Sequence, residues 1–148
     1  MSGPSGDSIP DSTGPPDRRT LRLLERHLGS ESLVAKTAFD PDIHEPRVLR
    51  VLLDVDQHPA SIVAARLDVR WFTTDDFSYH YVEERDDSQW ECRWDRHPNV
   101  HNSRLHFHQP PTAEKITNLS LPSLHPLEVS SMVFTAIEQR LAVLWGAK

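Results

Sequence analysis

The sequence contains little of what an exported or membrane-bound protein needs. Its single cysteine, Cys92, excludes a disulfide within the chain, which agrees with a reducing cytoplasm. No apolar run approaches the roughly 18 residues that a membrane-spanning helix requires. The start of the chain lacks the basic residues and the apolar run of a signal peptide. These absences predict a cytoplasmic protein that does not enter a membrane.

Large apolar side chains are also scarce at the start of the chain. Residues 1–17 contain three of the five glycines and four of the twelve prolines, and Ile9 is their one large apolar residue after Met1. Such a segment buries too little surface to offset the entropy of the chain, so residues 1–17 are predicted to form a disordered tail. Residues 18–148 suit a single domain.

The spacing of apolar residues in that domain predicts an α+β fold. Leucines at helical spacing in residues 18–28, with Asp17 as N-cap, predict a first helix, and a broad apolar stripe predicts a last helix over residues 126–145. In residues 63–71 every odd position is apolar, and Arg66, Asp68 and Arg70 occupy even positions. Alternating runs also occur at 33–39, 77–84 and 89–95, and residues 47–55 are β-branched and apolar enough for a further strand. We expect an antiparallel meander of about four or five strands with both terminal helices packed on one face, and an irregular segment at 109–126.

Histidine is concentrated in one short tract of the chain. Four of the nine histidines, at positions 97, 101, 106 and 108, lie within twelve residues, where even scatter would place roughly 0.7. Three arginines lie among or just before them, and Asp95 is the only acid between Arg93 and Ala113. In a chain of formal net charge -6, this tract is a local cationic region that titrates near neutral pH.

Strand alternation predicts how the tract is arranged. If residues 90–95 and 104–108 pair as a hairpin, their polar side chains share one face, and the connecting loop carries His97 and His101 above it. Arginines of the neighbouring strand 63–71 would line the same face. The polar face is then expected to carry Arg93, Asp95, Arg104, His106 and His108 from the hairpin, with Arg66 and Arg70 beside them.

Such a face suits cleavage of RNA without a metal ion or other cofactor. One imidazole acts as a base on the ribose 2′-hydroxyl and a second acts as an acid on the leaving oxygen, while a carboxylate holds one ring in the required tautomer. Arginines bind the phosphate and stabilise its developing charge. The predicted catalytic residues are His97, His101, His106, His108 and Asp95. The predicted substrate-binding residues are Arg66, Arg70, Arg93, Arg96 and Arg104.

Two other interpretations stay open from the residues alone. The same histidines suit zinc or nickel, with His101, His106 and His108 as the ligand set, although no family-specific metal spacing is present. Alternatively, they are loop and edge residues whose ring nitrogens bond to backbone carbonyls. In either case the chain would be a non-catalytic module, and its His/Arg face would bind a metal, a nucleotide or a protein.

The tract also resembles a known family. The motifs W-x-C-R-W-D-R-H-P-N (Trp90 to Asn99) and H-N-x-R-x-H-F-H-x-P-P (His101 to Pro111) are similar to archaeal relatives of the TumE toxins. The resemblance extends over roughly Leu21 to Trp145. It implies the toxin of a two-gene toxin–antitoxin module, which cleaves RNA and is neutralised by a DNA-binding antitoxin of the helix-turn-helix or winged-helix type. A homodimer is left open. Carried over by position, its functional candidates are Arg93, Asp95, Arg96, His97, His101, Arg104, His106 and His108.

Overall fold

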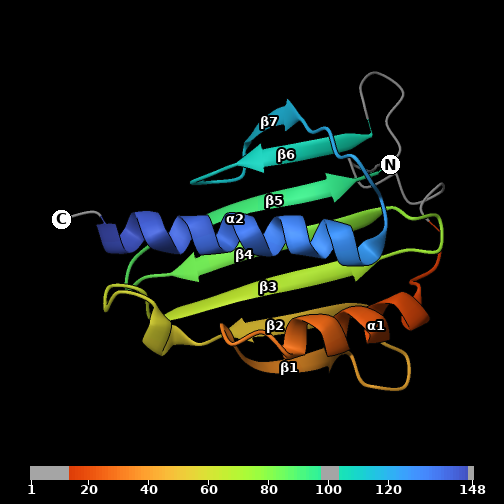
Figure 1. Ribbon diagram of the computed structural model, residues 1–148, viewed down its shortest axis with the longest axis horizontal. Helices are drawn as coiled ribbons and strands as arrows, with labels where there is room; N and C mark the ends of the chain where they lie inside the picture. Colours follow the sequence, from red (N-terminus) through yellow and green to blue (C-terminus); the bar gives the residue numbers. More distant parts are fainter. Residues whose placement is uncertain (1–13, 98–103, 147–148) are drawn as a thin grey trace, which may run out of the picture.

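The computed structural model describes residues 14–97 and 104–146. Its seven strands form one antiparallel sheet in chain order, and two helices flank them in sequence (Figure 1). The elements are α1 (Arg18–Gly29), β1 (Val34–Asp40), β2 (Val48–Leu53), β3 (Ala64–Trp71), β4 (Phe77–Glu84), β5 (Gln89–Arg96), β6 (Leu105–Gln109), β7 (Lys115–Asn118) and α2 (Pro126–Gly146). The predicted α+β class and antiparallel meander are confirmed. No helix in the described part of the chain is long and apolar enough to cross a membrane.

Helix α1 begins where the sequence predicts. The Asp17 carboxylate accepts hydrogen bonds from the backbone N–H of Thr20 at 3.1 Å and from its hydroxyl at 2.9 Å, and so satisfies an N-terminal N–H of the helix. Leu21, Leu24 and Leu28 lie on one side of the helix and are fully buried. Residues 14–17 lie against the end of β3, where the N–H of Asp17 donates to the carbonyl of Trp71. The rest of the predicted tail, residues 1–13, lies outside the described residues.

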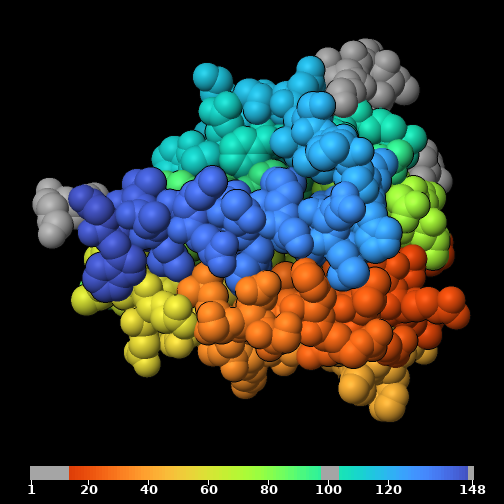
Figure 2. Space-filling view, viewed as in Figure 1, coloured from red at the N-terminus to blue at the C-terminus, as the bar shows by residue number. Residues whose placement is uncertain are grey.

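Both helices cover the same face of the sheet (Figures 1 and 2). The odd-numbered residues of β3 and β4 face them, and Trp71 stacks on Phe77 with ring centroids 4.8 Å apart. Helix α2 is held to β4 by a buried ion pair in which Arg140 donates two hydrogen bonds to Glu83. Since both helices lie on one side, no described helix covers the other side, which we call the open face.

The sheet is larger than the predicted meander. Residues 115–118, inside the segment expected to be irregular, form the edge strand β7 and pair with β6. A strand of four residues is too short to show a clear alternation, so it has no period-two signal in the sequence. Its backbone pairing with β6 is what makes it a strand.

Candidate functional site

Strands β5 and β6 pair as the sequence predicts. Asp95 lies opposite His106 and Arg93 lies opposite His108, whereas Trp94 lies opposite Phe107 on the helix-covered side. Residues directly opposite each other in an antiparallel pair point to the same face of the sheet. The pairing therefore brings an acid, a guanidinium group and two imidazoles together on the open face.

One oxygen of the Asp95 carboxylate is held by two neighbours. Its Oδ2 accepts hydrogen bonds from Nε2 of His108 at 2.9 Å and from Nε of Arg93 at 3.1 Å. The Nη2 atom of Arg93 lies 3.3 and 3.4 Å from the two ring nitrogens of His108, so the guanidinium group also contacts that imidazole. The three side chains fix one another's positions, with the carboxylate at the centre.

The other oxygen of Asp95 faces two further imidazoles without bonding to them. Its Oδ1 lies 3.8 Å from Nε2 of His97 and 3.8 Å from Nδ1 of His106, which is too long for a hydrogen bond. The rings of His97 and His106 have centroids 5.2 Å apart. Oδ1 is buried and has no hydrogen-bond partner among residues 14–97 and 104–146.

Burial and charge act in opposite directions on the ionisable groups of this cluster. Burial raises the pKa of Asp95, but the hydrogen bond from His108 and the charges of His108, His97 and Arg93 outweigh it, so the pKa lies below its usual value of 3.8. For His106, burial lowers the pKa below 6.5, and the attraction of Asp95 only partly offsets this shift. Near neutral pH the cluster therefore holds an ionised carboxylate next to a neutral His106.

The cluster reaches solvent through only some of its members. The side chains of Asp95, His106 and His108 are 7%, 5% and 8% exposed. His97 is 28% exposed and Arg93 is 36% exposed. A ligand approaching the open face therefore meets His97 and Arg93 first.

Two arginines of the predicted site bind elsewhere. Arg96 and Arg104 each place a guanidinium nitrogen 3.0 Å from Oδ1 of Asp76, a fully buried carboxylate in the turn between β3 and β4. The hydroxyl of Thr74 donates to the other oxygen of Asp76. Sequence reasoning missed Asp76 because a turn aspartate is common, and nothing local shows that arginines 20 and 28 residues later reach it.

The remaining predicted residues are spread over the open face or lie outside the described chain. Arg66 pairs with Asp68 at 3.1 Å and with Glu84 at 2.8 Å. His101, predicted as a catalytic residue and as one of three metal ligands, lies outside the described residues. Among the residues that are described, Asp95, His97 and His106 are placed to share a metal ion.

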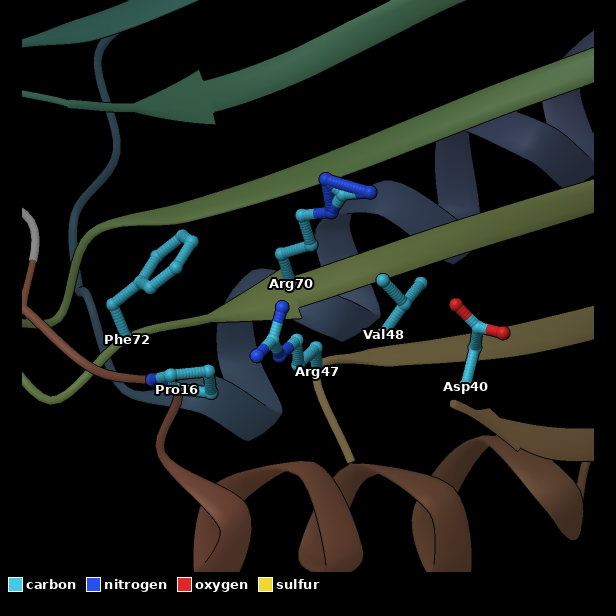
Figure 3. Close-up of a pocket in the computed structure, with 6 residues that line it drawn as sticks. All are labelled: Pro16, Asp40, Arg47, Val48, Arg70 and Phe72. Carbon is cyan, nitrogen blue, oxygen red and sulfur yellow. The ribbon is translucent and has the colours of Figure 1, made fainter. Parts of the chain in front are cut away.

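Arg70 lines a cavity of about 500 Å³ (Figure 3). The cavity lies where the end of β3 meets the start of β2, and its other walls are Pro16, Asp40, Arg47, Val48 and Phe72. Arg47 and Arg70 are both exposed. Neither guanidinium group has an ion-pair partner among the described residues. Arg47 was not predicted, because only the pairing of β2 with β3 brings it beside Arg70.

Cys92 is excluded as a nucleophile by its surroundings. It lies on the helix-covered side of β5, where burial raises the pKa of its thiol to about 12. A thiol that stays protonated near neutral pH is a poor nucleophile. It packs as a small apolar side chain in the core.

A protein-family model described as "Toxin TumE" matches residues 20–141 of the chain. Comparison with the curated proteins and with the solved structures found no match.

Proposed function

This chain belongs to the TumE toxin family, which indicates the toxin of a toxin–antitoxin system, and on that premise we propose that it is a metal-independent endoribonuclease. The observation that carries the proposal is the cluster of His97, His106 and His108 around the Asp95 carboxylate on the open face. Several imidazoles within reach of one another, one of them neutral, are what acid–base cleavage of RNA requires.

The proposed reaction uses two imidazoles that face each other. His106, in its neutral form, takes the proton of a ribose 2′-hydroxyl, and the 2′-oxygen attacks the adjacent phosphorus. The bond from phosphorus to the 5′-oxygen breaks, and protonated His97 donates a proton to that leaving oxygen. The products are a 2′,3′-cyclic phosphate and a 5′-hydroxyl. Because RNA supplies its own nucleophile, no serine or cysteine is needed.

The other members of the cluster position these two rings and the phosphate. His108 and Arg93 hold one oxygen of Asp95, and so keep the carboxylate between the reacting imidazoles. Arg93 is exposed enough to contact a phosphate, and its charge would stabilise the transition state. His101, predicted from the sequence, stays a candidate for the same chemistry.

The cavity lined by Arg70 provides a second place for the RNA backbone. Arg70 lies on the same phase of the sheet as Ser78 opposite it on β4, and Ser78 lies opposite Asp95. Two strand spacings, about 10 Å, therefore separate Arg70 from Asp95. Arg70 and Arg47 are free of acidic partners in the described chain and would bind a neighbouring phosphate. The ion pairs of Arg66, Arg96 and Arg104 favour structural roles for these three.

The toxin family implies an antitoxin partner. We propose that this partner is a DNA-binding protein of the helix-turn-helix or winged-helix type, that the toxin acts in the cytoplasm, and that it comes from an archaeon. Co-purification with the product of the neighbouring gene tests the first point. Size-exclusion chromatography of the free toxin tests whether it forms a homodimer.

The decisive experiment compares RNA cleavage by wild type and by two alanine variants, His97→Ala and His106→Ala. A labelled single-stranded RNA is incubated with each protein, with and without EDTA, at low and high salt. Each variant is expected to lose about 10²- to 10⁴-fold in rate, the usual contribution of an acid–base group. Cleavage by the wild type should survive EDTA and should weaken at high salt.

The matched control is His80→Ala. His80 also lies on the open face and contacts a carboxylate, with its Nε2 2.7 Å from Glu91, but it is not part of the cluster. It should retain wild-type cleavage. Circular dichroism and urea titration show whether each variant is folded. Undiminished cleavage by folded His106→Ala would reject the mechanism, and no cleavage by any protein would favour a binding module.

A further inference from the structure

The buried oxygen of Asp95 that has no described hydrogen-bond partner points to a ligand. Oδ1 is enclosed within the cluster, and a buried carboxylate oxygen without a partner is costly unless something neutralises it. Its two neighbours, Nε2 of His97 and Nδ1 of His106, are both 3.8 Å away. We propose that Asp95, His97 and His106 form a binding site for a transition-metal dication, and that the bound ion blocks the ribonuclease chemistry.

The spacing of these atoms suits an ion better than it suits direct bonds. One atom from each of the three side chains lies within 4.8 Å of the other two. Around a tetrahedral zinc ion, with bonds of about 2.0–2.1 Å, neighbouring ligand atoms are about 3.4 Å apart. Asp95 Oδ1 is already close to that distance from both nitrogens. Small rotations of His97 and His106 would complete the set and leave one position open to water.

The surroundings of the site support the same interpretation. His108 and Arg93 bond to the other oxygen of Asp95, and outer contacts of this kind orient a ligating carboxylate. Two imidazoles and one carboxylate favour zinc and similar metals over Mg²⁺ and Ca²⁺, which take oxygen ligands. The positive charge of Arg93 opposes any cation here, and so further favours metals that bind imidazole strongly.

The inhibitory effect follows from which atoms the metal would occupy, and it rests on the proposed ribonuclease activity. A nitrogen that coordinates a metal cannot at the same time accept or donate a proton. Metal binding would therefore remove His97 and His106 from the reaction. The binding site itself does not depend on that activity.

The first test measures metal binding alone, without RNA. Purified chain stripped with chelator and dialysed is titrated with Zn²⁺ by calorimetry and with Co²⁺ by visible absorption. Wild type should bind one ion per chain. His97→Gln and His106→Gln should each weaken binding by more than about 100-fold, and His108→Gln, which loses only an outer contact, by about 10- to 100-fold. His80→Gln should bind as wild type does. The site would be overturned if the wild type did not bind, or if His97→Gln and His106→Gln bound the ion as tightly as the wild type does.

The second test adds Zn²⁺ to the RNA cleavage assay at the concentrations that saturate the site. Cleavage by the wild type should fall in parallel with occupancy and should return with EDTA. Stimulation by Zn²⁺ would overturn the inhibitory role. A protein that binds Zn²⁺ but never cleaves RNA would refute the proposed function and leave the binding site standing. A protein that cleaves RNA but binds no metal would refute the binding site and leave the proposed function standing.

Discussion

Replacing Asp76 with alanine should destabilise the domain by about 3 kcal/mol. Its carboxylate is fully buried and accepts hydrogen bonds from Arg96, Arg104 and the Thr74 hydroxyl. A hydrogen bond to a charged group is worth about 1.5–3 kcal/mol, and one between a hydroxyl and a carboxylate is of similar or smaller size. The side chain of Arg104 is 45% exposed, so water replaces most of its contribution, which we place at about 0–1 kcal/mol.

The loss matters for the cluster because Asp76 holds both ends of the segment that contains His97. Arg96 directly precedes His97, and the backbone N–H of His97 donates to the carbonyl of Arg104 at 3.0 Å. Without Asp76, Arg104 loses its bond to the turn between β3 and β4, and Arg96 keeps only its hydrogen bonds to the backbone carbonyls of Thr74 and Asp75. RNA cleavage by Asp76→Ala should therefore fall even at temperatures where the variant is fully folded.

Urea denaturation followed by tryptophan fluorescence measures the change. With a slope of about 2 kcal/mol/M, the midpoint should fall by about 1.5 M. Asp86→Ala is the matched control, because Asp86 is an exposed aspartate in the next turn whose side chain has no hydrogen bond or ion pair in the described chain. It should stay within about 0.5 kcal/mol of wild type. If Asp76→Ala lost less than about 1 kcal/mol, or no more than the control, the role given to Asp76 would be wrong.

Three further predictions test the helix-covered face, the cluster and the cavity. Arg140→Leu leaves Glu83 as a buried charge without its ion-pair partner, and should lower the free energy of unfolding by about 3–5 kcal/mol in urea titrations. In EDTA, the free energy of unfolding should fall as the pH drops below 6.5, because the pKa of His106 is lowered in the folded chain and the unfolded chain therefore binds the proton first. It should fall again below pH 3.8, where the carboxylate of Asp95, whose pKa is also lowered by folding, becomes protonated in the unfolded chain first. The His106→Gln variant should lack the first decline. Arg70→Gln should reduce the salt dependence of RNA binding, with a slope of log K against log salt smaller by about 0.7, and an unchanged slope would exclude a phosphate contact at Arg70.

The sequence was most informative where a repeat of a few residues determines the face of a helix or strand on which each side chain lies. Alternation correctly separated buried from polar side chains along residues 65–71 of β3, although Val63, on the apolar phase, is exposed. The same rule placed His106 and His108 together with Asp95. The cap and the leucine spacing predicted α1 to within one residue. These features depend on neighbours within a few positions, which is why one sequence is enough to predict them.

The sequence was least informative about which partner each charged side chain selects. Arg96 and Arg104 belong to the same motifs as the clustered histidines, yet both bond to Asp76. Arg47 reaches the cavity beside Arg70 only because β2 pairs with β3. Contacts of this kind join residues some 20 positions apart, and no local pattern in the chain records them.

By itself, the sequence determined the class of fold, the pairing of β5 with β6 and the collection of imidazoles on one polar face, because strand phase follows from residue order alone. Only the tertiary structure decided how that face is divided. One oxygen of Asp95 bonds to His108 and Arg93, and the other lies between His97 and His106. The flanking arginines, Arg96 and Arg104, bond to the buried carboxylate of Asp76. The reason is geometric: alternation places a side chain on a face, but the distances between side chains from different strands depend on packing and register.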